Sequence, residues 1–107
     1  MSVFEVQTYV VKSEKREQFT PLLNEFLKFK ETHKDLFKGL KSWKLYKQEY
    51  GAISGMYIEM WEYENMVEME TISSRIFSDD GMKKISKGFH QLVEPATFSA
   101  SIWNSVV

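Results

Sequence analysis

A carboxylate and several aromatic rings lie close together between residues 56 and 70, in the stretch MYIEMWEYENMVEME. Tyr57, Glu59 and Trp61 follow one another at every second position. A carboxylate enclosed by aromatic rings loses water, and its pKa rises unless hydrogen-bond donors or a cation compensate. A raised pKa near neutrality suits a general base, so Glu59 is a candidate for accepting a proton from a bound ligand.

The spacing of this stretch is typical of a strand that ends at Tyr63. Side chains of a strand alternate between the two faces of a sheet, which separates two sets of residues. One set is apolar and the other is aromatic and polar: Met56, Ile58 and Met60 against Tyr57, Glu59, Trp61 and Tyr63. Because Met fills irregular gaps well, we expect the apolar set to pack beneath helices rather than to form a metal or cofactor site.

A second alternating segment, residues 3–11, places Glu5, Gln7 and Tyr9 on one face of a first strand. In the topology that the whole chain suggests, this strand pairs with the strand that carries Glu59. Candidate hydrogen-bond partners of Glu59 are Gln7, Tyr9, Lys44 and Tyr46. Two interpretations stay open, namely a ligand cavity with a proton-transfer carboxylate and a polar network that fixes a dimer.

The remaining periodicity predicts the elements that must position these residues. Helical spacing begins near Phe19, after a possible cap at Ser13. Pro21 indicates either a kink or a helix that starts there with Thr20 as its cap. The helix should end near Lys38–Gly39, because Gly readily adopts the left-handed cap conformation.

Two strands, residues 41–50 and 53–63, should then form an antiparallel hairpin around a turn at Gly51–Ala52. Asn65 is a candidate helix cap, and Asp79 or Asp80 restarts a helix that Pro95 ends. Residues 96–104 alternate again and predict a last strand.

The resulting order, β-α-β-β-α-β, is the ferredoxin-like pattern of an α+β protein. It predicts a four-stranded antiparallel sheet with its helices on one face. The other face would be bare, and a second copy packed against it would make a dimeric α/β barrel. The 107 residues correspond to a single domain, residues 1–107, whose modest core would benefit from such pairing.

Composition excludes several classes of function. The formal net charge is -1, from 14 basic and 15 acidic residues, without the basic excess of a nucleic-acid-binding protein. The absence of Cys excludes disulfides and thiolate chemistry. No apolar run approaches the roughly 20 residues of a membrane span, and the N-terminal residues resemble a strand rather than a signal segment. We therefore expect a cytoplasmic protein that binds neither nucleic acid nor membrane.

The residues IEMWEYENMVEME and the element order resemble the antibiotic-biosynthesis-monooxygenase-like and NIPSNAP-like dimeric α/β barrels. Members of that family often have an acidic residue, one spacer and Trp-Glu at the end of the third strand, which correspond here to Glu59, Trp61 and Glu62. The resemblance implies a homodimer of ferredoxin-like units. Some relatives oxidise polyketide quinols without a cofactor, others degrade haem, and many have no known activity.

The haem-degrading relatives use an amide residue on the first strand, a Trp on the third and a His on the next helix. Gln7 and Trp61 match the first two positions by this resemblance. Glu70 and Thr71 stand where the His is expected, which disfavours haem. We therefore expect no cofactor.

The two histidines, His33 and His90, have no neighbours at a typical metal-ligand spacing, so we predict no metal site. His33 should lie on the surface near the end of the first helix. His90 follows the predicted core residue Phe89, which favours a half-buried structural position, although it is also a candidate proton acceptor.

These observations support a small homodimer that binds a planar aromatic or lipid-like metabolite and acts as a monooxygenase-like enzyme. The candidate catalytic residues are Glu59 and His90, and the candidate ligand-binding residues are Gln7, Tyr9, Tyr57 and Trp61. Two alternatives stay open, a non-catalytic ligand-binding or stress-related dimer and a purely structural dimer whose aromatic face is the interface. A fold does not choose among them.

Overall fold

The computed structural model describes residues 2–51 and 55–107. Within these residues, four strands and three α-helices follow one another in the order β-α-β-β-α-α-β. In chain order they are β1 (Val3–Tyr9), α1 (Arg16–Thr32), β2 (Ser42–Lys47), β3 (Tyr57–Tyr63), α2 (Met66–Phe77), α3 (Asp80–Leu92) and β4 (Ser99–Asn104). Short 3₁₀ turns precede α1 and β4, at Ser13–Lys15 and Pro95–Thr97. None of the helices in these described residues is long and apolar enough to cross a membrane.

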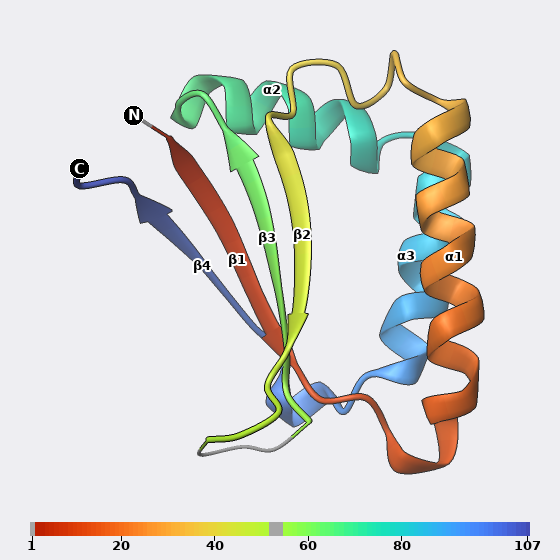
Figure 1. Ribbon diagram of the computed structural model, residues 1–107. Coiled ribbons are helices and arrows are strands. Elements are labelled where there is room, and N and C mark those ends of the chain that lie inside the picture. Colours follow the sequence, from red (N-terminus) through yellow and green to blue (C-terminus); the bar gives the residue numbers. More distant parts are fainter. Residues whose placement is uncertain (1, 52–54) are drawn as a thin grey trace.

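The strands form one antiparallel sheet in the order β2-β3-β1-β4. The helices lie on one side of this sheet, which remains open rather than closing into a barrel (Figure 1). The predicted α+β, ferredoxin-like fold is therefore confirmed, including the pairing of β1 with β3. The predicted turn at Gly51–Ala52 falls partly on residues 52–54, which lie outside the described residues.

The two C-terminal helices begin at the predicted caps. The Asn65 side chain accepts a hydrogen bond from the Glu68 backbone N–H, and the Asp79 side chain accepts one from Met82 N–H. Each cap satisfies a donor that the first turn of a helix leaves free.

Helix α1 ends earlier than the sequence indicated. It stops at Thr32, with His33 as its C-cap, and Pro21 lies inside it. Gly39 does adopt a positive φ of 93°, but it closes a series of turns rather than the helix itself. These turns direct Phe37 into the core, where it is 6% exposed and its ring lies 6.0 Å from that of Phe26. Burial of this ring gives a physical reason for leaving the helix early.

The aromatic and polar face of β3 lies beneath the helices, so the prediction that the Met face packs there was wrong. Trp61 and Tyr63 are 3% and 0% exposed and belong to the core that also contains Phe26, Ile72 and Ile85. Large rings can bridge the distance between a sheet and the helices above it. Alternation alone could not decide the question, because both faces of β3 carry apolar side chains.

The other side of the sheet forms what we call the open face. Strand register places six of its members on this side: Phe4, Val6, Thr8, Ile58, Met60 and Trp103. None of the described helices covers it (Figure 1). Trp103 is 61% exposed there, Phe4, Ile58 and Met60 are partly exposed, and Val6 is buried, so apolar side chains of this face reach solvent in the isolated chain.

Candidate functional site

Glu59 lies at the centre of a buried hydrogen-bond network. Its side chain is enclosed between sheet and helices, with the residue 7% exposed. Tyr9 Oη donates to Glu59 Oε2 at 2.8 Å. Trp61 Nε1 and Trp43 Nε1 both donate to Glu59 Oε1, at 2.9 Å and 3.2 Å. Three donors from three different strands therefore converge on one carboxylate.

The sheet register brings these donors together. Trp61 lies two residues after Glu59 on β3 and so shares its face. Trp43 is directly opposite Trp61 on β2, and Gln7 is directly opposite Glu59 on β1, which puts Tyr9 one step along the same face. Tyr9 and Trp43 are thus diagonal cross-strand neighbours of Glu59, while Trp61 is its same-face neighbour on β3.

Packing holds the Tyr9 ring in place. It stacks on Tyr57 at a centroid distance of 5.8 Å and meets the edge of Phe89 at 4.7 Å. Aromatic pairs of this kind stabilise by about 0.5–1.5 kcal/mol beyond the area that they bury. The hydroxyl of Tyr9 is therefore directed at Glu59 by contacts with both β3 and α3.

Burial determines the electrostatics of the network. Loss of water raises the pKa of Glu59 above its ordinary value, and hydrogen bonds from Tyr9, Trp61 and Trp43 offset only part of that effect. The charge of Glu5 raises the pKa further. Burial, followed by the charge of Glu59, also raises the pKa of Tyr9, so this phenol keeps its proton and remains a donor.

A cavity of about 110 Å³ adjoins this network, between the sheet and helices α1 and α3. We call it the pocket. Its walls are mostly aromatic and aliphatic, and no Lys or Arg is among its lining residues in the described part of the chain. A cavity of about 150 Å³ can hold benzene, so the pocket in this conformation is somewhat smaller than a site for one aromatic ring.

The structure brings most of the predicted site residues to the pocket. Four of the six line it from the sheet and one lines it from α3: Gln7, Tyr9, Glu59, Trp61 and His90. Tyr57 borders a neighbouring hollow instead and reaches the site through its stacking on Tyr9. The Gln7 amide donates to Glu5 Oε2 at 3.3 Å, not to Glu59.

The two histidines lie away from the carboxylate network. His90 is exposed rather than half-buried as predicted, with its ring 5.3 Å from Phe89 and 5.5 Å from Phe98. It therefore borders the pocket on its solvent side. His33 lies on the surface, as expected, stacked on Phe29 at 4.0 Å.

Two predicted partners of Glu59 lie on the wrong face, and one real partner was missed. Lys44 and Tyr46 are opposite Met60 and Ile58 and belong to the side of the open face. Trp43 takes the role that they were expected to have. The signal that could have found it is the register of β2, because a shift of one residue moves every side chain to the other face.

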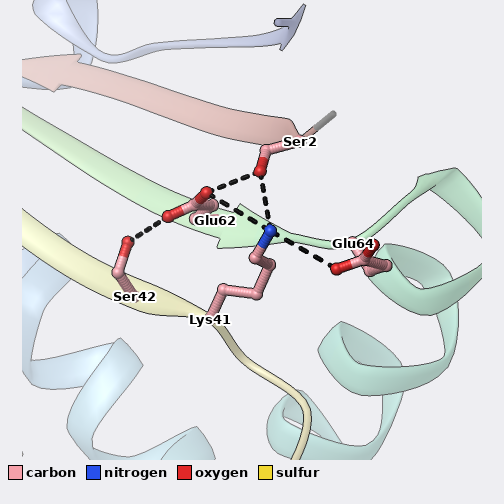
Figure 2. Close-up of polar contacts among 5 residues, drawn as sticks. All are labelled: Ser2, Lys41, Ser42, Glu62 and Glu64. Atoms are coloured by element: carbon pink, nitrogen blue, oxygen red, sulfur yellow. Dashed lines mark hydrogen bonds and ion pairs between the residues drawn. The ribbon is translucent and has the colours of Figure 1, made fainter.

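Glu62, the last member of the acidic-spacer-Trp-Glu pattern, lies on the opposite face and makes a separate cluster (Figure 2). Ser2 Oγ donates to its Oε2 at 2.6 Å, and Ser42 Oγ donates to its Oε1 at 2.7 Å. Lys41 Nζ lies 3.8 Å from Glu62 and 3.3 Å from Glu64. Hydrogen bonds from Ser2 and Ser42 lower the pKa of Glu62, so this carboxylate ties strand ends together and stays charged.

The interpretation of the Glu59 face as a sheet-to-sheet dimer network was also wrong, since this face lies under the helices. The pocket does not fit haem in this conformation, because its volume of about 110 Å³ is much smaller than a four-pyrrole macrocycle. Glu70 and Thr71, where haem-degrading relatives would have His, are exposed on α2. Within residues 2–51 and 55–107 no group of three or more His, Cys, Asp or Glu side chains could hold a metal ion.

Comparison with known proteins identifies relatives by fold. No family model and no curated protein sequence matches the chain. A NIPSNAP family protein from Agrobacterium tumefaciens is similar with a TM-score of 0.75 at 15% identity, over 98% of this chain and 86% of that one. A conserved protein from Methanosarcina mazei gives 0.72 at 16% identity, over 98% and 93% of the two chains.

SnoaB, a cofactor-independent oxygenase from Streptomyces nogalater, is similar with a TM-score of 0.68 at 11% identity, over 99% of this chain and 94% of that one. The structural neighbours are thus NIPSNAP proteins and antibiotic-biosynthesis-monooxygenase-like proteins. The resemblance predicted from the sequence is confirmed, and at these identities it is a resemblance of fold.

Proposed function

We propose that this chain is a single-domain, cytoplasmic homodimer that binds a small aromatic or lipid-like metabolite in the pocket. Glu59 accepts a proton from the bound molecule, and the reaction is of the cofactor-independent monooxygenase type. The observation that carries the proposal is a buried carboxylate beside an apolar cavity, with three donors and no Lys or Arg among the lining residues described.

The chemistry follows from the environment of Glu59. A general base works best when its pKa is near the working pH, and burial raises the pKa of this carboxylate towards that range. The donors Tyr9, Trp43 and Trp61 stabilise the charged form without a metal or a cation. Aromatic walls such as Phe19, Phe26 and Phe89 favour a flat apolar ligand, which excludes water from the base.

A dimer fits the open face. This face carries Phe4, Ile58, Met60 and Trp103 and is not covered by the described helices. A second copy packed against it would bury these side chains and leave the pocket free on the helix side. Specific obligate interfaces commonly bury more than about 2,000 Å² in total.

Non-catalytic ligand binding is the second candidate function. It is favoured by the exposed position of His90, because the titratable side chain that hydrogen-bonds to Glu59 is then Tyr9 and not a histidine. The same pocket would then act as a binding site only. The two functions differ in whether Glu59 is needed for turnover or merely for binding.

A matched pair of variants tests the proposal. Glu59→Gln keeps the shape of the side chain and removes its titration, whereas Glu62→Gln makes the same change three positions along β3 on the other face. Phenol, 1,4-hydroquinone, indole and short-chain fatty alcohols are suitable probes. Binding is followed by chemical shifts of the Trp43 and Trp61 indole N–H groups, and turnover by oxygen consumption.

We expect the wild type and Glu62→Gln to bind at least one probe and to consume oxygen with it, while Glu59→Gln binds but does not turn over. Binding without turnover in all three proteins, the wild type included, would favour the non-catalytic function. If no probe shifts either indole signal, the pocket is not a ligand site and the proposal fails.

A further inference from the structure

The two oxygens of Glu59 are not equivalent. Oε1 accepts hydrogen bonds from Trp43 and Trp61, and an indole N–H can only donate. Oε2 has Tyr9 as its partner, and a phenol hydroxyl can either donate or accept. We propose that Trp43 is a positioning residue that, together with Trp61, keeps Oε1 an acceptor in both protonation states, so that Oε2 alone carries the exchanged proton.

Counting acceptor sites supports this assignment. An ionised carboxylate has about four lone-pair sites, two on each oxygen. Both sites of Oε1 are taken by the indoles, while Oε2 keeps one site beyond its bond with Tyr9. A proton on Oε1 would have to displace an indole N–H, because both lone-pair sites of that oxygen are already occupied. Protonation at Oε2 leaves both indole bonds intact.

Trp43 is necessary for this asymmetry. With Trp61 alone, Oε1 and Oε2 would each hold a single donor, and rotation of the carboxylate would exchange two similar positions. The second indole comes from β2, a different strand, and closes the remaining site of Oε1 at 3.2 Å. The carboxylate is therefore held in one orientation relative to Tyr9 and the pocket.

The inference rests on the proposed role of Glu59 as a proton acceptor. In that step the ligand X–H bond breaks, an O–H bond forms at Oε2, and the electron pair stays on the ligand atom X. Charge moves from Glu59 to the ligand, and the proton transfer itself requires no oxidant or reductant. Tyr9 then either keeps its bond to Oε2 or rotates its hydroxyl to accept from the new O–H.

Two measurements on the free protein test the assignment without any ligand. In the wild type, the indole N–H signals of Trp43 and Trp61 should keep their hydrogen-bonded shifts and slow solvent exchange on both sides of the Glu59 titration. In Trp43→Phe, the Glu59 carboxyl-carbon titration should move upward by roughly one pH unit, because the ionised form loses one of its donors.

Trp103→Phe is the matched control, because Trp103 lies on β4 on the open face and its Nε1 donates to Ser101 Oγ at 2.8 Å, on the opposite side of the sheet from Glu59. Its Glu59 titration should equal that of the wild type.

The assignment is overturned if Trp43→Phe leaves the titration unchanged, or if either wild-type indole N–H loses its hydrogen-bonded shift when Glu59 is protonated. If Trp43→Phe does not fold, the wild-type indole measurement still decides. Failure of probe binding with these results intact would reject the proposed function but not the positioning role.

Discussion

Removing one buried hydroxyl should make this protein more stable. Tyr63 is 0% exposed, and within the part of the chain that the structure describes its hydroxyl has no hydrogen-bond partner. A buried polar group without a partner costs about 1–3 kcal/mol of desolvation free energy. Tyr63→Phe keeps the ring in the core and removes that cost, so we expect the free energy of unfolding to rise by about 1 kcal/mol.

Tyr9→Phe makes the same chemical change on the same face of the sheet but should have the opposite effect. The Tyr9 hydroxyl donates to Glu59 at 2.8 Å, and a hydrogen bond to a charged group contributes about 1.5–3 kcal/mol. Its loss should lower the free energy of unfolding wherever Glu59 is ionised. The two variants therefore separate a hydroxyl that is only buried from one that is bonded.

Urea unfolding followed by far-ultraviolet circular dichroism at pH 8 measures both changes. Protein concentration must be the same in every experiment, because association would add to the apparent stability. For a domain of about 100 residues, 1 kcal/mol corresponds to a shift of roughly 4–8 °C in Tm. A Tyr63→Phe protein that is less stable than the wild type by 1 kcal/mol or more would refute the reasoning, since the hydroxyl would then have a partner such as an ordered water.

Three further experiments follow from the same structure. Because burial raises the pKa of Glu59, its contribution to stability is fully present below the unfolded pKa of about 4.3 and is lost as pH rises through the folded pKa. The stability of Glu59→Gln relative to the wild type should therefore increase over this window in urea titrations at several pH values, and a difference independent of pH would contradict the raised pKa. Glu62 behaves in the opposite way, because its lowered pKa gives stability that is present above about pH 4.3 and is lost as pH falls through the folded pKa. Glu62→Gln should therefore be less stable than the wild type at pH 7 and equally stable in acid. An equal loss of unfolding free energy at pH 3 and pH 7 would count against the Ser2 and Ser42 hydrogen bonds. Met60→Lys places a charge on the open face and should convert a dimer into monomers in sedimentation equilibrium at micromolar concentration, whereas a monomeric wild type would remove the argument for a dimer.

Alternation along the strands was sufficient to predict that Tyr9, Glu59 and Trp61 share one face. It could not say which face the helices cover, because Met60 and Ile58 are as apolar as the rings opposite them. Which face the helices cover depends on the distance between the helices and the sheet, and large side chains such as Tyr63 can span that distance. Element order, which depends only on local pattern, was predicted for the whole sheet.

The role of Trp43 depended on register, which a single strand does not reveal. Lys44 and Tyr46 were expected at the site, but the register of β2 places them on the other face of the sheet. A one-residue shift of a strand exchanges its two faces. The end of α1 was missed for a related reason, since Phe37 is drawn into a core that forms only when distant elements meet. Local sequence thus predicted the elements, and long-range packing decided which residues complete the site.

The position of the two indoles beside Glu59 also has a spectroscopic consequence. Trp43 and Trp61 lie 6.3 Å apart with their ring planes at 79°, and both donate to Oε1 of the titrating carboxylate, while the third tryptophan lies on β4 on the open face. Two indoles this close, held in a fixed arrangement, should couple their strong transitions and give a circular dichroism couplet in the far ultraviolet. A change of charge at Glu59 would alter the field on both rings at once. We therefore expect the couplet to report the protonation state of the candidate base without any label.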